Sequence, residues 1–360
     1  MEGLPMPAPL VELTEDGLLC RAGGFYVDPW RPVERAIITH AHGDHAQADS
    51  EHYLAATPGL GVLRLRVGAS ANIHGLAYGE AIKLGEVTVS LHPAGHILGS
   101  AQVRIERAGE VWVVSGDYKL GLDPTCTPFE PVRCHTFISE STFGLPVYRW
   151  APQSEIFEDI NNWWAGNKAA GKASLLLCYA LGKAQRILAG IDGSIGPVYL
   201  HGAVERVTQA YRAAGVLMVP TKLVGPAKRG DDWKGSLILA PPSALHTPWG
   251  RRFRPLVSGF ASGWMRVRGA RRRRAVDRGF VLSDHADWPG LLAAISATGA
   301  SRVLVTHGHA APLTRFLQEQ GLEAEVLATQ FVGEGEEASD AGAENKEPAR
   351  ETEASEEVAS

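Results

Sequence analysis

The chain has 360 residues, 45% of them hydrophobic, and a net charge of −5, which suffices for one large domain or two ordinary ones. Its sequence has no apolar run of membrane-spanning length, and residues 1–10 lack the basic and apolar regions of a secretory signal. The four cysteines are scattered without a Cys-x-x-Cys pair, which favours reduced thiols in the cytoplasm over a disulfide frame or a zinc ribbon.

The negative charge is concentrated at the C-terminus. Residues 333–360 carry ten acidic and two basic side chains, so the other 332 residues have a net charge of +3. This tail is rich in Glu, Ala and Ser, and we expect it to be disordered. A solubilising tail is one interpretation, and an electrostatic mimic of nucleic acid is the other.

The first informative motif follows the short apolar run Ala36–Ile38, which we expect to be a buried strand. That run ends in the sequence His40-x-His42-x-Asp44-His45. Imidazole and carboxylate are ligands that zinc prefers. Ligands at these spacings on a tight loop cannot all reach one ion, so the motif predicts two ions a few Å apart, as in two-metal hydrolases. A histidine-rich surface turn is the alternative.

The same arrangement recurs along the chain, because further expected strands run directly into a loop that carries a histidine or a carboxylate. These residues are His96, Asp117, Glu140, His285 and His307. Any one of them could be an ordinary turn residue. As an ordered series they indicate one composite site.

The middle of the chain, residues 148–257, alternates strand and helix patterns without a ligand cluster, which predicts a small parallel sheet. A helix expected to begin near Gly182-Lys183 could hold a phosphate through its free N–H groups.

An arginine-rich run follows: residues 251–278 hold ten arginines against one acid, Asp277, with aromatic residues between them. Arginine forks suit phosphate and aromatic rings suit base stacking, so we expect contact with nucleic acid; a solvated charged face is the alternative. The arginines expected to bind are Arg266, Arg268, Arg271, Arg272, Arg273 and Arg274.

As a set, these motifs resemble those of the metallo-β-lactamase superfamily. Glu140-Ser141-Thr142-Phe143-Gly144, Ser283-x-His285 and His307 resemble motifs A, B and C of its β-CASP subgroup, which processes nucleic acids. The resemblance implies an α/β fold, an αββα four-layer sandwich with an inserted β-CASP α/β domain. The implied divisions are residues 1–147, an insertion at 148–257, a return at 258–332 and the disordered acidic tail at 333–360.

The resemblance also implies roles at the site. One ion would be held by His40, His42 and His96, and the second by Asp44, His45 and His307, with Asp117 bridging the two. Asp28 would orient a ligand histidine, and His285 with Glu140 would protonate the leaving oxygen. The expected catalytic set is therefore Asp28, Asp44, Glu140 and His285. The expected cofactors are two divalent ions, zinc or alternatively manganese, and His309 is given no role.

The segments Phe25–Pro32 and Ser262–Met265 resemble bacterial DNA-ligase-associated exonucleases. This implies a DNA exonuclease in DNA repair, associated with an ATP-dependent DNA ligase and a helicase. The alternative is an RNA endo- or exonuclease of the mRNA 3′-processing type, which the match at His307 favours. A non-catalytic nucleic-acid-binding protein and a small-molecule hydrolase are further alternatives, but the full ligand set argues against the first and the insertion and arginine run against the second.

Overall fold

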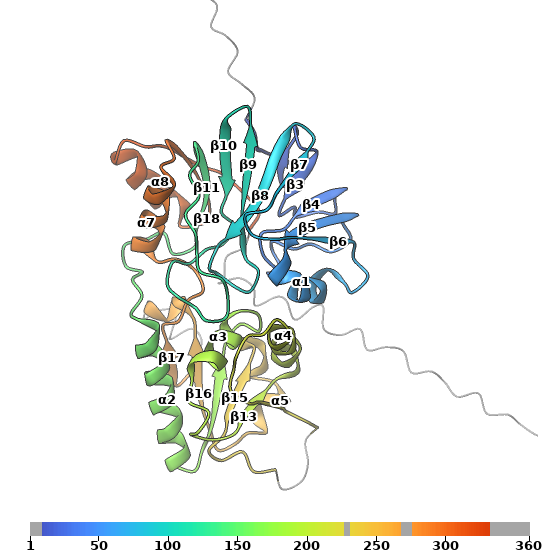
Figure 1. Cartoon of the computed structure of the whole chain (residues 1–360). Coiled ribbons are helices and arrows are strands. Elements are labelled where there is room, and N and C mark those ends of the chain that lie inside the picture. Colours follow the sequence, from blue (N-terminus) through green and yellow to red (C-terminus); the bar gives the residue numbers. More distant parts are fainter. Residues whose placement is uncertain (1–8, 227–230, 268–275, 332–360) are drawn as a thin grey trace, which may run out of the picture.

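The computed structural model describes residues 9–226, 231–267 and 276–331. In Figure 1 these residues form two bodies, one above the other. The upper body contains two sheets built from the N-terminal and C-terminal parts of the chain, and the lower body contains a third sheet built from the middle. The lower body is therefore an insertion within the upper one.

The first sheet of the upper body is formed by N-terminal strands in sequence order, antiparallel at first and parallel from β3 onward. Its strands are β1 (Glu12–Leu13), β2 (Leu18–Cys20), β3 (Phe25–Val27), β4 (Arg35–Ile37), β5 (His52–Ala56) and β6 (Ile73–Leu76). The buried run that precedes the histidine motif is β4 and the residues after it.

The second sheet joins strands from both ends of the chain, in the order β19-β18-β11-β10-β9-β8-β7. Its strands are β7 (Ala81–Leu84), β8 (Val87–Pro93), β9 (Ala101–Arg107), β10 (Glu110–Val114), β11 (Thr136–Ser141), β18 (Arg302–Gly308) and β19 (Glu323–Val326). Strands β10, β11, β18 and β19 are parallel, so their carboxyl ends lie at one edge of the sheet.

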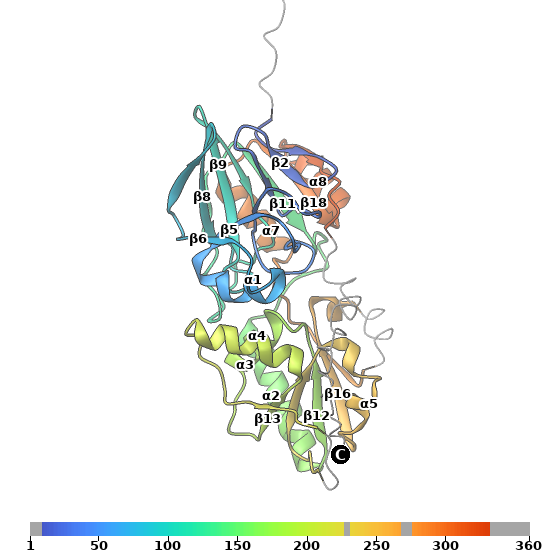
Figure 2. The same cartoon turned by 90° about the vertical axis from the view of Figure 1, so that its right-hand side faces the viewer.

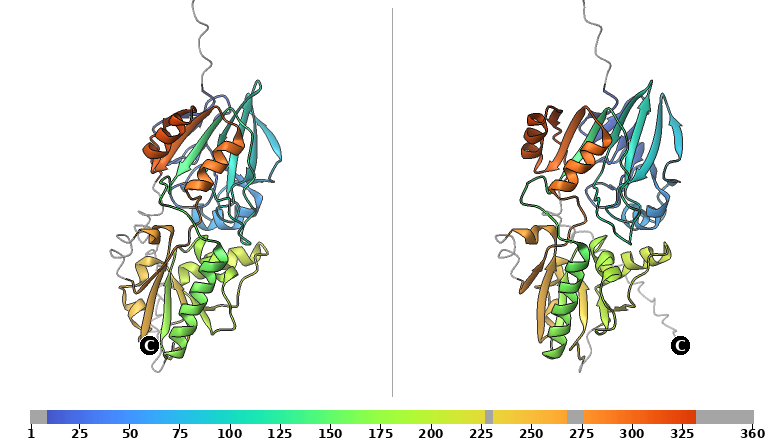
Figure 3. Two further views of the ribbon diagram at one scale, coloured as in Figure 1. Left: turned by 90° about the vertical axis from the view of Figure 1, so that its left-hand side faces the viewer. Right: turned by 60° about the vertical axis from the view of Figure 1, so that its left-hand side comes forward.

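Apolar side chains of the two sheets face each other and form a common core, with Leu18, Val89 and Val103 among its fully buried members. Helices α7 (Trp288–Thr298) and α8 (Ala310–Glu319) cover the outer face of the second sheet, as the orange and red ribbons in Figure 3 show. Helix α1 (Leu60–Val67) packs on the outer face of the first sheet. The upper body is thus layered helix, sheet, sheet, helix.

The third sheet is entirely parallel, in the order β14-β13-β15-β12-β16-β17. Its strands are β12 (Ala173–Leu177), β13 (Val198–Leu200), β14 (Lys222–Leu223), β15 (Leu237–Ala240), β16 (Leu256–Ala261) and β17 (Arg278–Phe280). Every residue of β12 and β15 is buried, because helices cover both faces of a parallel sheet. The parallel sheet expected from the sequence is therefore present.

Helices α2 (Gln153–Ala169), α3 (Lys183–Gly190) and α4 (Gly202–Ala213) contribute to the core on one face of this sheet, and the short α5 (Pro248–Arg251) lies on the other. The sequence placed the end of the insertion at residue 257, whereas β16 and β17 extend the inserted sheet to Phe280. The chain then returns directly to the upper body.

The two bodies meet where α1 packs against α4, which Figure 2 shows from the side. Among the described residues, no helix combines the length and apolarity needed to cross a membrane.

Candidate metal centre

The side chains predicted from the sequence come together at strand ends beneath the upper body. Asp117 follows β10, Glu140 lies near the end of β11, and His307 lies near the end of β18. Because these strands are parallel neighbours, their carboxyl ends place the three side chains side by side. The histidine loop after β4 and the His96 loop after β8 complete the cluster.

Three imidazoles converge on one point. Nδ1 of His42 lies 3.1 Å from Nε2 of His40 and 3.0 Å from Nε2 of His96. The carboxylate oxygen Oδ2 of Asp117 lies 3.4 Å from Nε2 of His40 and 3.8 Å from Nε2 of His96. In a tetrahedral zinc site with bonds of about 2.05 Å, ligand nitrogens lie about 3.3 Å apart, so this spacing is close to that of a metal site.

The outer nitrogens of these rings have partners that fix the tautomer. His96 Nδ1 lies 2.8 Å from the carbonyl oxygen of Asp284, which can only accept, so this nitrogen carries the proton. His40 Nδ1 lies 3.0 Å from Thr39 Oγ1, whose own hydrogen goes to Asp28. The inner nitrogens of His40 and His96 are therefore lone pairs, and a cation between them would relieve their repulsion.

A second group shares Asp117 and adds His45 and His307. His45 Nδ1 donates to Asp28 Oδ2 at 2.7 Å, and His307 Nδ1 lies 2.9 Å from Thr306 Oγ1. The opposite nitrogens, Nε2 of His45 and Nε2 of His307, are buried and have no hydrogen-bond partner among the described residues. The same is true of Asp117 Oδ1, 3.2 Å from His307 Nε2. Buried polar atoms left in this way fit a bound cation.

Asp44 is partly buried, and its Oδ2 lies 3.6 Å from His45 Nε2. Asp28 accepts three hydrogen bonds, two from Thr39 and one from His45, and so fixes both the loop and the ring. It adopts a positive φ of 45°, a conformation that Asp tolerates better than most residues.

The electrostatics of the site also favour a cation. Burial lowers the pKa of His40 and His96 well below 6.5, so both rings are neutral at neutral pH. Burial also lowers the pKa of His45, but Asp44 and Asp117 outweigh it and raise that pKa to about 10. Burial raises the pKa of Asp117, but the neighbouring imidazoles, His45 first, outweigh it and keep Asp117 ionised.

Glu140 and His285 form a buried pair beside the first group. His285 Nδ1 lies 2.9 Å from Glu140 Oε2 and 3.9 Å from Asp117 Oδ2. The other oxygen of Glu140 accepts from the backbone N–H of Tyr118 at 2.7 Å. The pair adjoins the ligand cluster without belonging to either group of inner nitrogens.

Several residues around the site were given no role at the metal centre by the sequence. Phe331 stacks on His45 with ring centroids 4.4 Å apart and also contacts His307 edge-on at 5.7 Å. A buried charged cluster at the junction of the two bodies contains Lys119, Asp123, Lys183, Arg186 and Asp284. Burial and the neighbouring Arg186 lower the pKa of Lys119 to about 7.

The prediction of a phosphate site at the start of α3 is wrong. The N–H of Gly182 donates to the side chain of Gln185 at 2.8 Å, and Lys183 is fully buried 3.2 Å from Asp284. His309 directly precedes α8, stacks on Tyr148 with ring centroids 5.9 Å apart and lies close to Trp264.

Of the arginines expected to bind nucleic acid, Arg266 is exposed and donates to the carbonyl oxygen of Val147 at 3.3 Å. The others lie outside the described residues, as does the acidic tail: Arg268, Arg271, Arg272, Arg273 and Arg274.

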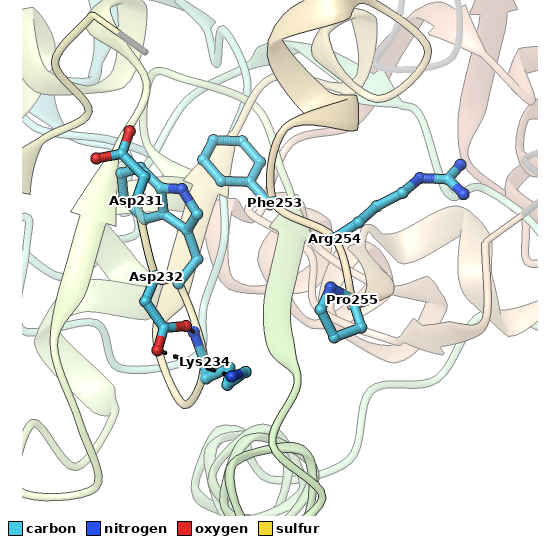
Figure 4. A pocket seen from close by; sticks show the side chains of 7 residues that line it. Asp231, Asp232, Lys234, Phe253, Arg254 and Pro255 are labelled. Atoms are coloured by element: carbon cyan, nitrogen blue, oxygen red, sulfur yellow. Dashed lines mark hydrogen bonds and ion pairs between the residues drawn. The ribbon is translucent and has the colours of Figure 1, made fainter. Parts of the chain in front are cut away.

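A pocket of about 420 Å³ lies elsewhere in the inserted body, lined by Asp231 to Lys234 and by Phe253 to Pro255 (Figure 4). These residues precede β15 and β16, so they lie at the amino ends of the parallel strands. Residues that follow β12 and β17, by contrast, lead toward the metal centre. The pocket contains none of the predicted site residues.

Comparisons with known proteins complete the picture. No family model matches the chain. A probable DNA ligase of Opitutus terrae is 32% identical over 310 residues, which is 86% of this chain and 30% of that protein. The transcription termination factor FttA of Pyrococcus horikoshii is 31% identical over 155 residues, 38% of this chain and 23% of that one. An RNase J-like protein of Methanocaldococcus jannaschii is 29% identical over 157 residues, 40% and 36% of the respective chains.

This chain therefore spans between 23% and 36% of the length of these relatives. Among solved structures, a protein of unknown function from Enterococcus faecalis has a TM-score of 0.55 over 83% of this chain and 80% of its own, at 13% identity. At that identity the similarity concerns the fold alone.

Proposed function

Because the chain belongs to the β-CASP nuclease group of the metallo-β-lactamase superfamily, we propose that it is a metal-dependent phosphodiesterase acting on nucleic acid. The observation that carries the proposal is the position of Asp117. One of its oxygens faces His40 and His96, and the other lies 3.2 Å from His307. A single carboxylate between two groups of inward-facing ring nitrogens suits two ions that share a ligand.

We assign the metal ligands to these two groups: His40, His42, His96 and Asp117 around one ion, and Asp44, His45, His307 and Asp117 around the other. Zinc suits the imidazole-rich set, and manganese is the alternative. When bound, such a pair supplies a hydroxide nucleophile at neutral pH and offsets charge on the phosphate oxygens. We further assign residues 9–147 and 281–331 to the metallo-β-lactamase domain and 148–280 to the β-CASP domain, since the third sheet ends at Phe280.

The protein's own residues perform the remaining steps. Asp28 holds His45 in one orientation and one tautomer through its 2.7 Å hydrogen bond. Glu140 holds the ring of His285 through the 2.9 Å contact and so orients it to give a proton to the leaving oxygen. Burial of both keeps bulk water away from this proton.

DNA is the substrate we propose, with stepwise digestion from an end. The relative named a probable DNA ligase aligns with 86% of this chain, which supports action beside a DNA ligase in repair. The helicase is a further proposed partner that rests on the sequence resemblance alone. RNA cleavage is the second candidate, because other relatives are named RNase J-like protein and endoribonuclease.

The test is a side-by-side digestion of end-labelled single-stranded DNA, double-stranded DNA and matched RNA with manganese or zinc. Asp44→Ala is the inactive control, and Asp192→Asn, at an exposed loop, is the matched neutral control. Stepwise loss of DNA that requires Asp44 supports the proposal. Cleavage of RNA alone would favour the second candidate substrate. Activity that persists in Asp44→Ala would contradict the assignment of Asp44 as a metal ligand.

A further inference from the structure

The buried charged cluster at the junction links the inserted body to the metal centre. Helix α3 of the inserted body contributes Lys183 and Arg186, whose side chains are 0% and 1% exposed. Arginine and lysine are almost never buried to this extent unless they are paired. Their partners lie in the upper body and in the segment that returns to it.

All three nitrogens of the Arg186 guanidinium group donate hydrogen bonds. Nε donates to Asp123 Oδ2 at 2.5 Å, and Nη1 donates to the carbonyl oxygen of Ser283 at 2.6 Å. Nη1 also lies 3.2 Å from Asp284 Oδ1, and Nη2 donates to the carbonyl oxygen of His96 at 3.3 Å. One side chain thus contacts three separate segments of the chain, two of which carry site histidines.

Two lysines add to this arrangement. Lys183 Nζ lies 3.2 Å from Asp284 Oδ2, and Lys119 Nζ donates to the carbonyl oxygen of Ser283 at 2.7 Å. Asp284 is therefore held from both of its carboxylate oxygens. Lys119 and Arg186 therefore hold the carbonyl group of Ser283, while Lys183 and Arg186 hold the side chain of Asp284.

This backbone, from Ser283 to Asp284, in turn holds two of the site histidines, His96 and His285. The carbonyl oxygen of Asp284 accepts the Nδ1 proton of His96 at 2.8 Å, which points His96 Nε2 toward His40 and Asp117. His285 is the next residue, and its backbone N–H donates to Ser283 Oγ at 3.1 Å. A shift of this backbone would move one metal-ligand candidate and the proton donor together.

We propose that Arg186 and Lys183 are positioning residues of the metal centre, supplied by the inserted body, that set the orientation of His96 and His285. Fork geometry and charge are both needed, because the contacts of Arg186 diverge to two carboxylates and two carbonyl groups. This inference rests on the proposed function for its meaning in catalysis. Its test does not depend on nuclease activity.

The test is a titration of metal-free protein with cobalt(II), followed by its visible absorption, which reports coordination geometry and affinity. Arg186→Lys keeps the charge and removes the fork. The matched control is Arg212→Lys on helix α4, because Arg212 bonds Val219 and Thr221 within the inserted body and does not contact the junction. We expect Arg186→Lys to bind cobalt about 10- to 100-fold more weakly with an altered spectrum, and the control to match the wild type.

Lys183→Gln is the second variant, in case Arg186→Lys does not fold. It removes one contact to Asp284 and should shift the cobalt spectrum in the same direction. Where the wild type cleaves a substrate, both variants should lower kcat more than they change KM. A cobalt affinity and spectrum equal to the wild type in a folded variant, with only a lower melting temperature, would overturn the proposal and leave the cluster structural.

If the wild type cleaves no nucleic acid, the proposed function fails while the cobalt titration still decides this inference. If the wild type cleaves and the variants bind cobalt normally, the inference fails alone. The two outcomes are therefore separable.

Discussion

Oε2 of Glu140 lies 2.9 Å from Nδ1 of His285, although 145 positions separate the two residues in the chain. Glu140 is in strand β11 of the upper body, and His285 comes just after β17, the last strand of the inserted sheet. The pair therefore forms only when the chain has completed the insertion and returned. Because Tyr118 occupies the other carboxylate oxygen, the glutamate is held in place and fixes the imidazole.

His285→Ala should lower kcat by about 10²- to 10⁴-fold, the usual contribution of a positioned proton donor, and leave the metal content unchanged. Metal analysis and steady-state cleavage on the same preparation measure both quantities. His74→Ala, at an exposed histidine of β6, is the matched control and should be neutral. Loss of metal together with activity would instead place His285 among the ligands, and an unchanged kcat would remove it from proton transfer.

Asp28→Asn should weaken metal binding by about 10- to 100-fold. The Asp28 carboxylate uses both oxygens to accept hydrogen bonds from Thr39 and His45, whereas the amide of asparagine has only one acceptor oxygen. Leaving a buried donor unpaired should also lower the free energy of unfolding by about 1–3 kcal/mol. Equilibrium dialysis with zinc and denaturant unfolding of the metal-free protein measure the two effects. Asp192→Asn, whose carboxylate accepts only local hydrogen bonds at an exposed loop, should change neither. If Asp28→Asn binds metal as tightly as the wild type, then the hydrogen bond from His45 to the Asp28 carboxylate is not needed for metal binding.

The ligand candidates could be predicted from the sequence because each follows an apolar strand, and strand ends are visible as local patterns. Parallel pairing of β10, β11 and β18 then brings Asp117, Glu140 and His307 to one edge. Their roles at the metals remain proposals. Local sequence patterns identified the type of each ligand candidate and its position at the end of a strand.

The junction cluster could not be predicted in this way. The partners of Arg186 are 63, 90 and 97 positions away in the chain, and a helix carrying Lys183 and Arg186 has the pattern of an ordinary solvated face. The expected boundary at residue 257 falls inside strand β16 for a related reason. Strands β16 and β17 lie within and beside the arginine-rich run, which hides their apolar pattern. Strand β16 pairs with β12 and β17 pairs with β16, and both pairings are non-local.

Binding of a metal ion beside His45 should release a proton. In the metal-free protein the pKa of His45 is raised to about 10, so the ring is protonated at pH 8, and an ion at Nε2 must displace that proton. We expect about one proton released per protein from His45 between pH 7 and pH 9, and metal affinity that rises with pH across this range. Calorimetry in two buffers with different ionisation enthalpies measures the release.

The same shift has a consequence for the stability of the metal-free protein. A raised pKa means that the folded state binds the proton more tightly than the unfolded state, so His45 stabilises the fold fully below about pH 6.5. That contribution should be lost as the pH rises toward 10. His45→Gln should abolish both the proton release and this part of the pH dependence. Release of no proton by the wild type at pH 8 would contradict the assigned role of His45.

Replacing Arg271–Arg274 by glutamine should weaken nucleic-acid binding and flatten its dependence on salt. Each phosphate neutralised by an arginine contributes about 0.7–0.9 to the slope of log K against log salt, so loss of four contacts should reduce that slope by about 3. Fluorescence anisotropy with labelled single-stranded DNA at several salt concentrations measures it. The charge-matched control replaces four exposed arginines that lie beside carboxylates in the upper body: Arg21, Arg31, Arg35 and Arg315. A control that flattens the slope equally would show that net charge alone acts, and an unchanged slope in the Arg271–Arg274 variant would show that these arginines contact no phosphate.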